Sequence, residues 1–264
     1  MELQHEALHR LAGELRSDEF PTLSCPHCDQ LTLSPGKPHW TPDPGVAASQ
    51  DNDAWEPDWL YGTFHLPLTC RNCDRVVTSL GTYRVDFDSQ NSHRQMEWIQ
   101  LMTVDVLYPP VALLRIPRQT PDNIQGCIRN AFSAWPWLPG SAANLFRQAV
   151  ELVLDEVNIP SVDDSESKRR MTLDSRLKAL AKSDVELAGL LSAIKWIGND
   201  GSHSADVTRN DVLEVADIVE LALAALYEDK TRQQAIGQRV ARINTSRGVG
   251  GLRLEDAKDR KAVT

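Results

Sequence analysis

The sequence predicts an α+β protein, in which a small β-rich module precedes an all-α helical bundle. Three observations support this order. Residues 62–88 alternate apolar and polar side chains and are rich in β-branched residues, as is typical of half-buried strands. From residue 120 onward, apolar residues recur instead at helical spacing, in about five segments separated by turns or capping residues. Finally, two Cys-x-x-Cys pairs lie in the first half of the chain only.

The 264 residues, of which 41% are hydrophobic and 25% charged, have the composition of a globular protein with a buried core. No apolar run approaches the roughly 20 residues that are needed to cross a bilayer. The first residues, MELQHEALHRLAGEL, do not resemble a signal peptide. We therefore expect a cytoplasmic protein with no membrane segment. The formal net charge of −9 argues against a surface that is basic throughout.

The charge is unevenly distributed along the chain. Residues 230–264 hold nine Lys or Arg against three Asp or Glu, whereas the preceding residues are acidic overall. A basic tail can bind phosphate or an acidic protein surface, but solvated, disordered termini have the same composition. We predict a basic, partly disordered tail over residues 230–264. Contact with nucleic acid by this tail or by Lys168-Arg-Arg170 stays open as an alternative.

The first half is divided into three segments. Residues 1–19 are expected to form an N-terminal helix, because four leucines recur near the helical period. The β-module is expected over residues 20–105, and residues 34–58, rich in Pro, Asp and Trp, are interpreted as an inserted loop without regular structure. Residues 106–119, which contain Pro109-Pro110, form the expected linker.

The helical bundle is expected over residues 120–229. Each predicted helix begins at a polar turn, a proline or a residue whose side-chain oxygen can accept a backbone hydrogen bond. These start signals are Thr120-Pro121, Gly140-Ser141, Thr172, Asp184 and Thr208. Thr208 is followed three residues later by Asp211, which predicts a capping box. Cys127 falls on the apolar stripe of the first helix and is interpreted as a packing residue rather than a nucleophile.

Four of the five cysteines form two Cys-x-x-Cys knuckles. A knuckle on a tight turn points both of its sulfurs at one ion, so two knuckles supply the four thiolates of a tetrahedral zinc site. The predicted zinc ligands are Cys25, Cys28, Cys70 and Cys73. We therefore predict a zinc ribbon with a structural zinc ion, the 41 residues between the knuckles being long for such a module. Reduced or redox-active dithiols are the alternative, and His27 and His65 are close enough in sequence to replace a cysteine.

The segment WIGNDGSH, residues 196–203, ends the fourth helical pattern. Its apolar face continues up to Gly198, and a glycine is an ordinary place for a helix to stop. Periodicity alone therefore predicts a helix end followed by a polar turn. On the second helix, Arg147 and Glu151 are four residues apart, so they share a face and can pair.

Two motifs give residues 118–228 a resemblance to a known family. Arg147-Gln-Ala-Val-Glu151 and the run from Gly198-Asn199 to His203 resemble the Arg-x-x-x-Glu and Gly-Asn-x-x-x-His motifs of the prokaryotic domain of unknown function DUF4145. That family is grouped with the HEPN superfamily of helical bundles, and a zinc module often precedes it. The resemblance implies a HEPN-like bundle, a homodimer formed through the bundle, and a role in restriction, toxin–antitoxin or antiphage systems.

The sequence departs from the ribonucleases of that superfamily at one position. They carry Arg-Asn-x-x-x-His, and Gly198 stands here in place of the arginine that would stabilise charge on the scissile phosphate. We therefore expect a non-catalytic module of a prokaryotic defence or restriction-type system, which binds a ligand, nucleic acid or a defence-system protein. A polar network that only docks two helices is a further possibility.

The alternative function is a metal-independent endoribonuclease. In it His203 would act as general acid or base and Asn199 would orient the substrate. Arg147 or Lys195 would replace the missing cation, and Glu151 would belong to the same cluster.

Overall fold

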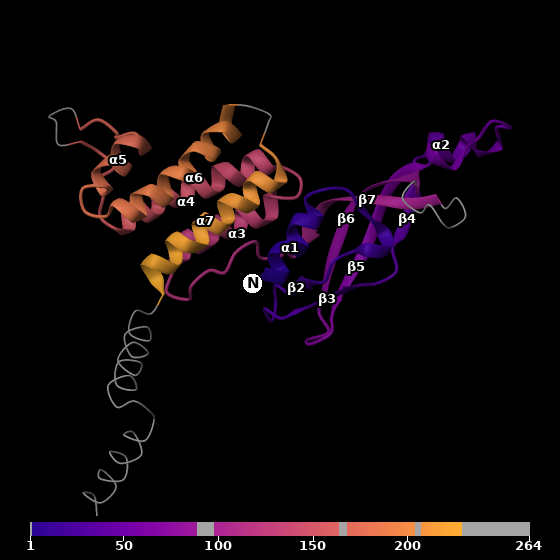
Figure 1. Ribbon diagram of the computed structural model, residues 1–264, viewed down its shortest axis with the longest axis horizontal. Coiled ribbons are helices and arrows are strands. Elements are labelled where there is room, and N and C mark those ends of the chain that lie inside the picture. Colours follow the sequence, from indigo (N-terminus) through magenta and orange to yellow (C-terminus); the bar gives the residue numbers. More distant parts are fainter. Residues whose placement is uncertain (1, 89–97, 164–167, 204–206, 229–264) are drawn as a thin grey trace, which may run out of the picture. The chain divides into compact units, whose positions relative to one another are not determined.

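The computed structural model describes four stretches of the chain, residues 2–88, 98–163, 168–203 and 207–228, with the backbone alone described at residues 2, 3 and 196–203. Its contacts group residues 1–225 into one compact unit and assign residues 226–264 to a second. The first unit holds an antiparallel sheet followed by helices, which confirms the α+β class (Figure 1). The predicted tail, residues 230–264, lies outside the described residues. No described helix combines the length and apolar character that spanning a membrane requires.

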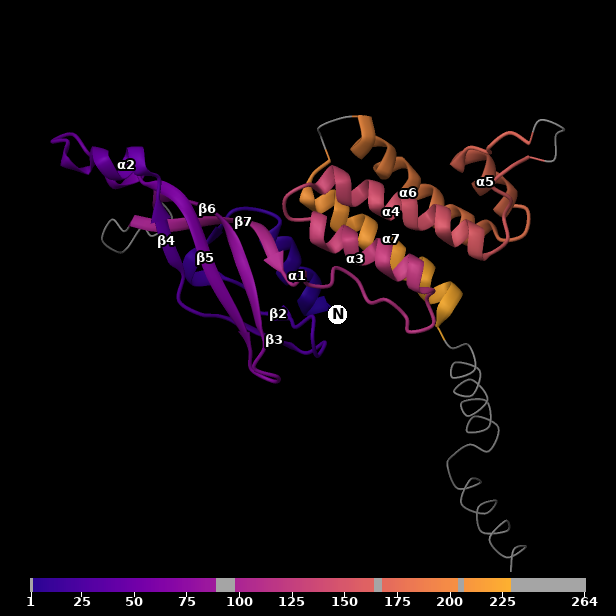
Figure 2. The ribbon, with the colours of Figure 1, turned by 180° about the vertical axis from the view of Figure 1, so that it is seen from behind.

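Seven strands form one antiparallel sheet in the order β1-β7-β6-β5-β3-β2, and β4 also pairs with β5. The strands are β1 (Leu15–Arg16), β2 (Leu23–Ser24), β3 (Leu31–Pro35), β4 (His39–Pro42), β5 (Tyr61–Cys70), β6 (Val76–Phe87) and β7 (Trp98–Tyr108). The long strands β5, β6 and β7 are neighbours in the chain and in the sheet (Figure 2). The sheet is therefore larger than the small module that the two cysteine pairs suggested.

The alternating pattern that predicted the strands also marks their buried face. On β5, Phe64, Leu66 and Leu68 are buried, while the side chains between them are more exposed. Trp40 of β4 joins this apolar layer, with its ring centroid 6.0 Å from that of Phe64 and 4.7 Å from that of Tyr83. The sheet thus has a buried apolar layer of its own.

The N-terminal helix is shorter than the predicted 1–19 segment. Helix α1 spans Glu2–Leu11, and Leu15 belongs to β1, opposite Met102 of β7. Leu15 fits the helical period of the preceding leucines, but Gly13 disfavours continuation of the helix. The edge of β7 also offers backbone partners that satisfy the hydrogen-bonding groups of this segment.

The interpretation of residues 34–58 as a loop without regular structure is wrong. This segment contains β4, helix α2 (Pro44–Ala48) and the 3₁₀ turns Ser49–Asp51 and Pro57–Trp59. The Asp43 carboxylate accepts a hydrogen bond of 2.9 Å from the amide of Gly45, and Pro44 occupies the first turn of α2. An Asp-Pro pair within the segment that was interpreted as a loop therefore starts a helix.

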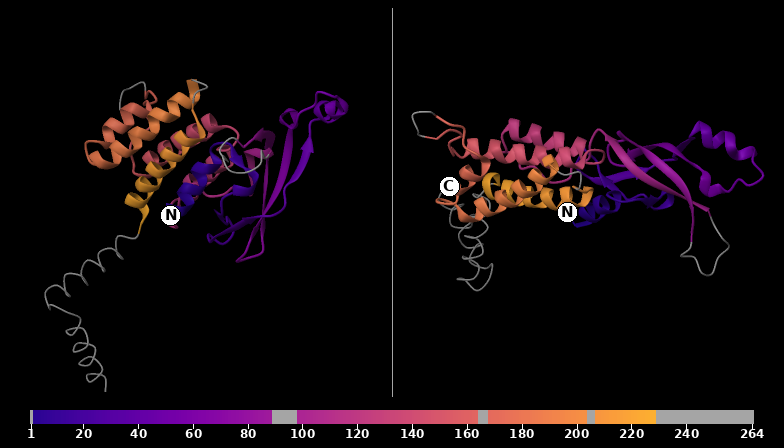
Figure 3. Two further views of the ribbon diagram at one scale, coloured as in Figure 1. Left: turned by 45° about the vertical axis from the view of Figure 1, so that its right-hand side comes forward. Right: turned by 90° about the horizontal axis from the view of Figure 1, so that it is seen from above.

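Within the described residues, five helices follow the sheet, as predicted. They are α3 (Asp122–Ala134), α4 (Pro139–Glu156), α5 (Leu173–Leu180), α6 (Val185–His203) and α7 (Arg209–Tyr227). Apolar side chains of α3, α4, α6 and α7 meet in one core, including Ile128, Phe146, Leu191 and Val219. Further views of the ribbon show these helices packed side by side (Figure 3).

Most of the predicted helix starts are confirmed. Thr172 and Asp184 each accept a hydrogen bond from the amide three residues further on, at 3.2 and 2.9 Å. In the capping box, the amide of Thr208 donates to the Asp211 carboxylate (2.8 Å) and the amide of Asp211 donates to the Thr208 hydroxyl (3.2 Å). Thr120 does not act as a cap: its buried hydroxyl has no hydrogen-bond partner among the described residues, and α3 begins two residues later.

Helix α6 does not end at Gly198, contrary to the prediction. It continues through this glycine to His203. One glycine inside a helix costs only about 1 kcal/mol, which the continued backbone hydrogen bonds and the packing of α6 against α4 can outweigh. The polar end of WIGNDGSH is therefore helical, and Asn199 and His203 are one helical turn apart.

A buried ion pair links β7 to the start of α7. The guanidinium of Arg209 donates to the Asp105 carboxylate over 3.0 Å, with side-chain exposures of 16% and 13%. Burial raises the pKa of Asp105, and the adjacent guanidinium opposes this rise. The buried indole of Trp135, the residue that directly follows α3, donates to the backbone carbonyl of Arg209 over 2.9 Å. Arg209 thus joins a strand and two helices.

Candidate metal centre and helical-bundle pocket

The structure brings the four predicted zinc ligands together. The sulfur atoms of Cys25, Cys28, Cys70 and Cys73 all lie within 4.8 Å of one another. Between knuckles, the Cys25 and Cys73 sulfurs are 3.7 Å apart and the Cys28 and Cys70 sulfurs are 3.6 Å apart. All four cysteines are free. This grouping confirms that the two pairs form one cluster.

The two knuckles have the same backbone geometry. In the first, the amide of Asp29 donates to the carbonyl of Cys25 over 2.9 Å, and in the second the amide of Asp74 donates to the carbonyl of Cys70 over 3.0 Å. Asp29 and Asp74 have positive φ angles of 58° and 59°, a conformation that aspartate tolerates better than most residues. The first turn follows β2 and the second joins β5 to β6, so the sheet itself holds the knuckles face to face.

Hydrogen bonds to sulfur make the four thiols unequal. Burial opposes ionisation of Cys70, but the Thr32 hydroxyl and two backbone amides prevail and lower its pKa to about 6. At Cys73 the amide of Arg75 favours the thiolate, but burial and the neighbouring sulfurs prevail and raise the pKa to about 12. A bound cation would replace the protons that the crowded thiols otherwise retain.

The cluster has the dimensions of a tetrahedral metal site. Four sulfurs at about 2.3 Å from a zinc ion lie roughly 3.8 Å apart, close to the 3.6 and 3.7 Å found between the knuckles. Sulfurs in a disulfide are about 2.05 Å apart, so neither of these pairs is oxidised. His27 lies outside the cluster and its ring nitrogen is 3.1 Å from the guanidinium of Arg75, while the exposed His65 lies on β5 opposite His39. The four cysteines alone therefore fit a metal ion.

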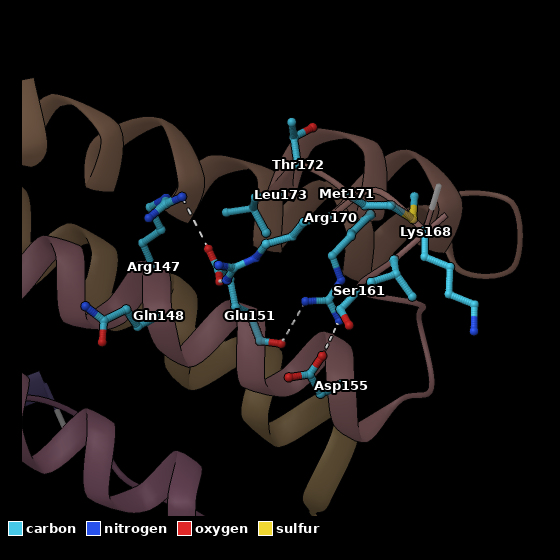
Figure 4. A pocket seen from close by; sticks show the side chains of 12 residues that line it. Arg147, Gln148, Glu151, Asp155, Ser161, Lys168, Arg170, Met171, Thr172 and Leu173 are labelled. Carbon is cyan, nitrogen blue, oxygen red and sulfur yellow. Dashed lines mark hydrogen bonds and ion pairs between the residues drawn. The ribbon is translucent and has the colours of Figure 1, made fainter. Parts of the chain in front are cut away.

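A pocket of about 860 Å³ opens between α4, α5 and the segment that joins them. We name it the α4–α5 pocket. Its charged lining consists of Arg147, Glu151, Asp155, Lys168, Arg170 and Arg176. Figure 4 shows Arg147 and Lys168 at opposite ends of this pocket, with Glu151 and Arg170 between them. Four cations against two carboxylates give the lining a positive balance, although the chain as a whole has a net charge of −9.

One carboxylate holds two of these arginines. Glu151 lies 3.2 Å from a terminal guanidinium nitrogen of Arg147 and 3.6 Å from one of Arg170. The first contact is the pair that was expected from the spacing of four residues, and it is drawn in Figure 4. The Arg170 side chain is 84% exposed, and the buried Nε of Arg147 has no hydrogen-bond partner within the described part of the chain. The exposed Arg170 therefore retains donors for a further anion, and the pairing of Arg147 leaves one of its buried donors unsatisfied.

Arg176 also lines the pocket, although no sequence motif pointed to it. It is only 4% exposed, and its guanidinium donates to the Asp155 carboxylate over 2.5 Å and to the Ile159 carbonyl over 2.8 Å. A signal was present, since Arg176 falls on the apolar stripe of α5 beside the buried Leu173 and Leu177. A lone arginine on an apolar face usually marks a charge with specific partners.

Lys195 is engaged elsewhere. Its buried ammonium, on a residue only 6% exposed, donates to the carboxylate of Asp174 on α5 over 2.8 Å. Hydrogen bonds from Lys178 and Lys195 lower the pKa of Asp174 to about 2. Lys195 also precedes His203 by eight residues, about 12 Å along a helix. To replace the missing arginine beside His203, Lys195 would have to leave the carboxylate of Asp174.

Two of the remaining predicted site residues, Asn199 and His203, have side chains that lie outside the described part of the structure. Their contacts with Arg147 or Glu151 therefore remain predictions. Cys127 is half-buried on α3, and its thiol donates to the carbonyl of Leu145 over 3.2 Å. Burial raises the pKa of this thiol, which disfavours the nucleophilic thiolate. This agrees with a packing role.

Comparison with known proteins identifies two families along the chain. Residues 130–244 match the model of a family described as Domain of unknown function (DUF4145), and residues 14–110 match a second one, Domain of unknown function (DUF8608). A search of curated proteins and a search of solved structures found no match. The first match contains Arg147, Glu151 and the Asn199–His203 run, and the second contains all four clustered cysteines. The chain is therefore similar to two domains of unknown function, one over the β-rich part with the cysteine cluster and one over the helical part with the basic pocket.

Proposed function

We propose that the protein is a non-catalytic binding module that takes a phosphate-bearing ligand in the α4–α5 pocket. The observation that carries this proposal is the charge of the lining, with four cations against two carboxylates in a chain of net charge −9. The volume of about 860 Å³ lies within the range of small-ligand sites. A nucleotide, or one end of a single-stranded nucleic acid, has a suitable size and charge.

Arginine suits this role better than lysine would. A guanidinium presents a planar fork of donors that matches two oxygens of one phosphate. Arg147 and Arg170 share Glu151, so an incoming phosphate can compete with that carboxylate for both. Arg176 already donates to Asp155 and to the Ile159 carbonyl, so it contributes charge to the lining and has fewer donors left for a ligand.

The second part of the proposal is a structural zinc ion in the cysteine cluster. Cys25, Cys28, Cys70 and Cys73 would hold it and leave no protein position open for water, so the ion would supply no catalytic water. It would join the turn after β2 to the turn between β5 and β6, as in a zinc ribbon. Elemental analysis of the purified protein should find one zinc per chain, and an iron content instead would contradict this assignment.

The pocket is tested by equilibrium binding to the full-length protein. The probes are inorganic phosphate, ATP and a fluorescein-labelled ten-nucleotide RNA, each measured at two salt concentrations. Changing both Arg147 and Arg170 to Gln should weaken binding of a recognised probe by at least roughly tenfold. Glu151→Gln should tighten it, because the competing carboxylate is removed.

The matched control is Arg129→Gln on α3. Arg129 is exposed, its guanidinium donates to the side chain of Gln125, and it does not line the pocket. It should leave binding unchanged. If wild type binds none of the probes, or if the Arg129 variant loses as much affinity as the pocket variant, the pocket is not the binding site.

A metal-independent endoribonuclease is the second candidate function. One observation favours it: α6 runs without interruption to His203, so Asn199 and His203 lie four residues apart and share a helix face. A general acid or base and an orienting amide would then face one substrate. The missing cation at Gly198 would have to come from Arg147, since Lys195 is paired with Asp174.

Incubation with RNA under magnesium-free conditions distinguishes the two functions. Wild type and His203→Ala are compared after retention of zinc has been checked. Cleavage by wild type alone would establish the ribonuclease and reject a purely binding role, whereas equal background in both supports the binding module.

The biological setting that we propose is a prokaryotic defence or restriction-type system, in which the helical bundle forms a homodimer. The resemblance of Arg147-x-x-x-Glu151 and Gly198-Asn199-x-x-x-His203 to the family motifs supports this setting. Leu221 of α7, 60% exposed amid buried neighbours, is consistent with a contact between bundles. Sedimentation equilibrium tests the dimer: wild type should have the mass of two chains and Leu221→Lys the mass of one. If wild type and the variant have the same mass, this face of α7 is not the interface.

A further inference from the structure

Two histidines on α1 face each other beside α7. The Nε2 atoms of His5 and His9 are 2.9 Å apart, and their ring centroids are 4.3 Å apart. The other ring nitrogen of each histidine faces an oxygen on α7. Nδ1 of His9 lies 2.8 Å from the Asn210 side-chain oxygen, and Nδ1 of His5 lies 3.4 Å from an oxygen of Asp217.

These oxygens decide where the ring protons are. A carboxylate and an amide oxygen can only accept, so these neighbours favour the tautomer in which Nδ1 of each ring carries the proton. In a neutral imidazole the remaining nitrogen, Nε2, then carries a lone pair. Two lone pairs at 2.9 Å repel each other unless a cation lies between them. A proton or a metal ion at the Nε2 atoms of His5 and His9 would remove this repulsion.

We propose that His5 and His9 form a binding site for a divalent transition-metal ion, separate from the cysteine cluster. Imidazole nitrogens bind such ions at about 2.0–2.1 Å, and two of them at a right angle are then roughly 2.9 Å apart. The observed separation is 2.9 Å. Right angles between nitrogen ligands are typical of Ni²⁺ and Cu²⁺, and a small ring rotation also admits tetrahedral Zn²⁺.

The surroundings match what a metal-binding histidine needs. Metal-ligating histidines generally donate their second ring N–H to a carboxylate or a carbonyl, which fixes the tautomer and the ring plane. Asn210 occupies this position for His9, and the Asp217 carboxylate lies 3.4 Å from Nδ1 of His5. The His5 side chain is 46% exposed, so an ion can enter from solvent and water can fill its remaining coordination positions. Because the ligands lie on α1 and their acceptors on α7, a bound ion also strengthens the contact between these two helices.

The test uses the untagged, zinc-loaded, full-length protein titrated with Ni²⁺ by calorimetry. The expected result is one Ni²⁺ per chain beyond the zinc, with affinity at least tenfold lower in both His5→Ala and His9→Ala. His39→Ala is the matched control, since His39 is an exposed histidine on β4 opposite His65. It should bind nickel as wild type does.

A further variant checks the proton positions. Asn210→Asp places a group that can only accept beside His9, so it should keep or increase the affinity for Ni²⁺. Loss of binding in this variant would mean that an amide N–H faces His9 and that the two histidines simply share a hydrogen bond, which overturns the proposal.

Measurements on wild type guard against a variant that merely misfolds. X-ray absorption at the nickel edge should find two imidazole ligands. The absence of stoichiometric nickel binding by wild type, or loss of binding in His39→Ala, would also overturn the proposal. The result is independent of the α4–α5 pocket, because neither histidine lines that pocket.

Discussion

Replacement of Cys28 by serine should destabilise the protein by breaking the cross-link between the two knuckles. Cys28 is half-buried, whereas Cys25 and Cys70 are buried, so this change removes little packing. A bound metal closes a loop of 41 residues between Cys28 and Cys70. The loop-closure relation for a covalent cross-link of this length gives about 4 kcal/mol. The free energy of unfolding should therefore fall by at most about 4 kcal/mol.

The measurement is urea unfolding of zinc-loaded wild type and Cys28→Ser, followed by circular dichroism. Cys127→Ser is the matched control, because Cys127 lies outside the cluster and a hydroxyl can also donate to the carbonyl of Leu145. Hydrogen exchange should show protection lost around the knuckles and retained along the β5–β7 strands, whose apolar layer does not depend on the metal.

Two results would refute this reasoning. One is a Cys28→Ser protein that is as stable as the Cys127→Ser control although wild type contains zinc. The other is complete unfolding of the sheet when the metal is lost, which would mean that the apolar layer around Phe64, Leu66 and Leu68 cannot sustain the strands.

Three further predictions concern the helices. The pKa of Asp174 is lowered to about 2, whereas in the unfolded chain it is about 4. The contribution of Asp174 to the free energy of unfolding is therefore complete above about pH 4 and is lost as the pH falls toward 2. Acid unfolding of Asp174→Asn should consequently depend less on pH across this range than acid unfolding of wild type. Asp211→Ala removes one half of the capping box and should cost about 1 kcal/mol in urea unfolding; no loss would show that the cap is energetically idle. Phe146→Ala empties a fully buried position on α4 and should cost about 3–5 kcal/mol, with a loss below 1 kcal/mol indicating that the core can collapse around it.

Much of the cysteine cluster could be predicted because its geometry is local. A Cys-x-x-Cys pair followed by a residue that tolerates positive φ defines a knuckle, and both pairs have an aspartate at that place, Asp29 and Asp74. That the two knuckles meet follows from chemistry, because four thiols in two such turns suit one ion. The strands around them could also be predicted, because side chains alternate with a period of two.

The α4–α5 pocket was predictable only in part. The pairing of Arg147 with Glu151 follows from helical geometry, whereas Arg170 reaches the same carboxylate through the path of the connecting segment. Arg176 and Asp155 lie on different helices, so only the packing of α5 against α4 brings them together. Helical periodicity gives the face of a residue and says nothing about which helix lies opposite.

Local signals also misled where the tertiary structure outweighed them. Gly198 has the features of a helix end, yet α6 continues, since its backbone hydrogen bonds and packing exceed the modest cost of one glycine. Conversely, Asp43-Pro44 was interpreted as irregular although it contains an ordinary helix start. The length of a helix therefore depends on its neighbours as well as on its own residues.

The ion pair between Asp105 and Arg209 has a consequence for the order in which the chain is made. A ribosome releases the β-strand that contains Asp105 about a hundred residues before it releases Arg209, as their separation of 104 positions requires. During that interval the carboxylate lacks its counter-ion, and burying it is unfavourable. The end of β7 can therefore reach its final packing only after α7 has been synthesised, so a fragment that ends before α7 should expose this edge to chaperones and proteases.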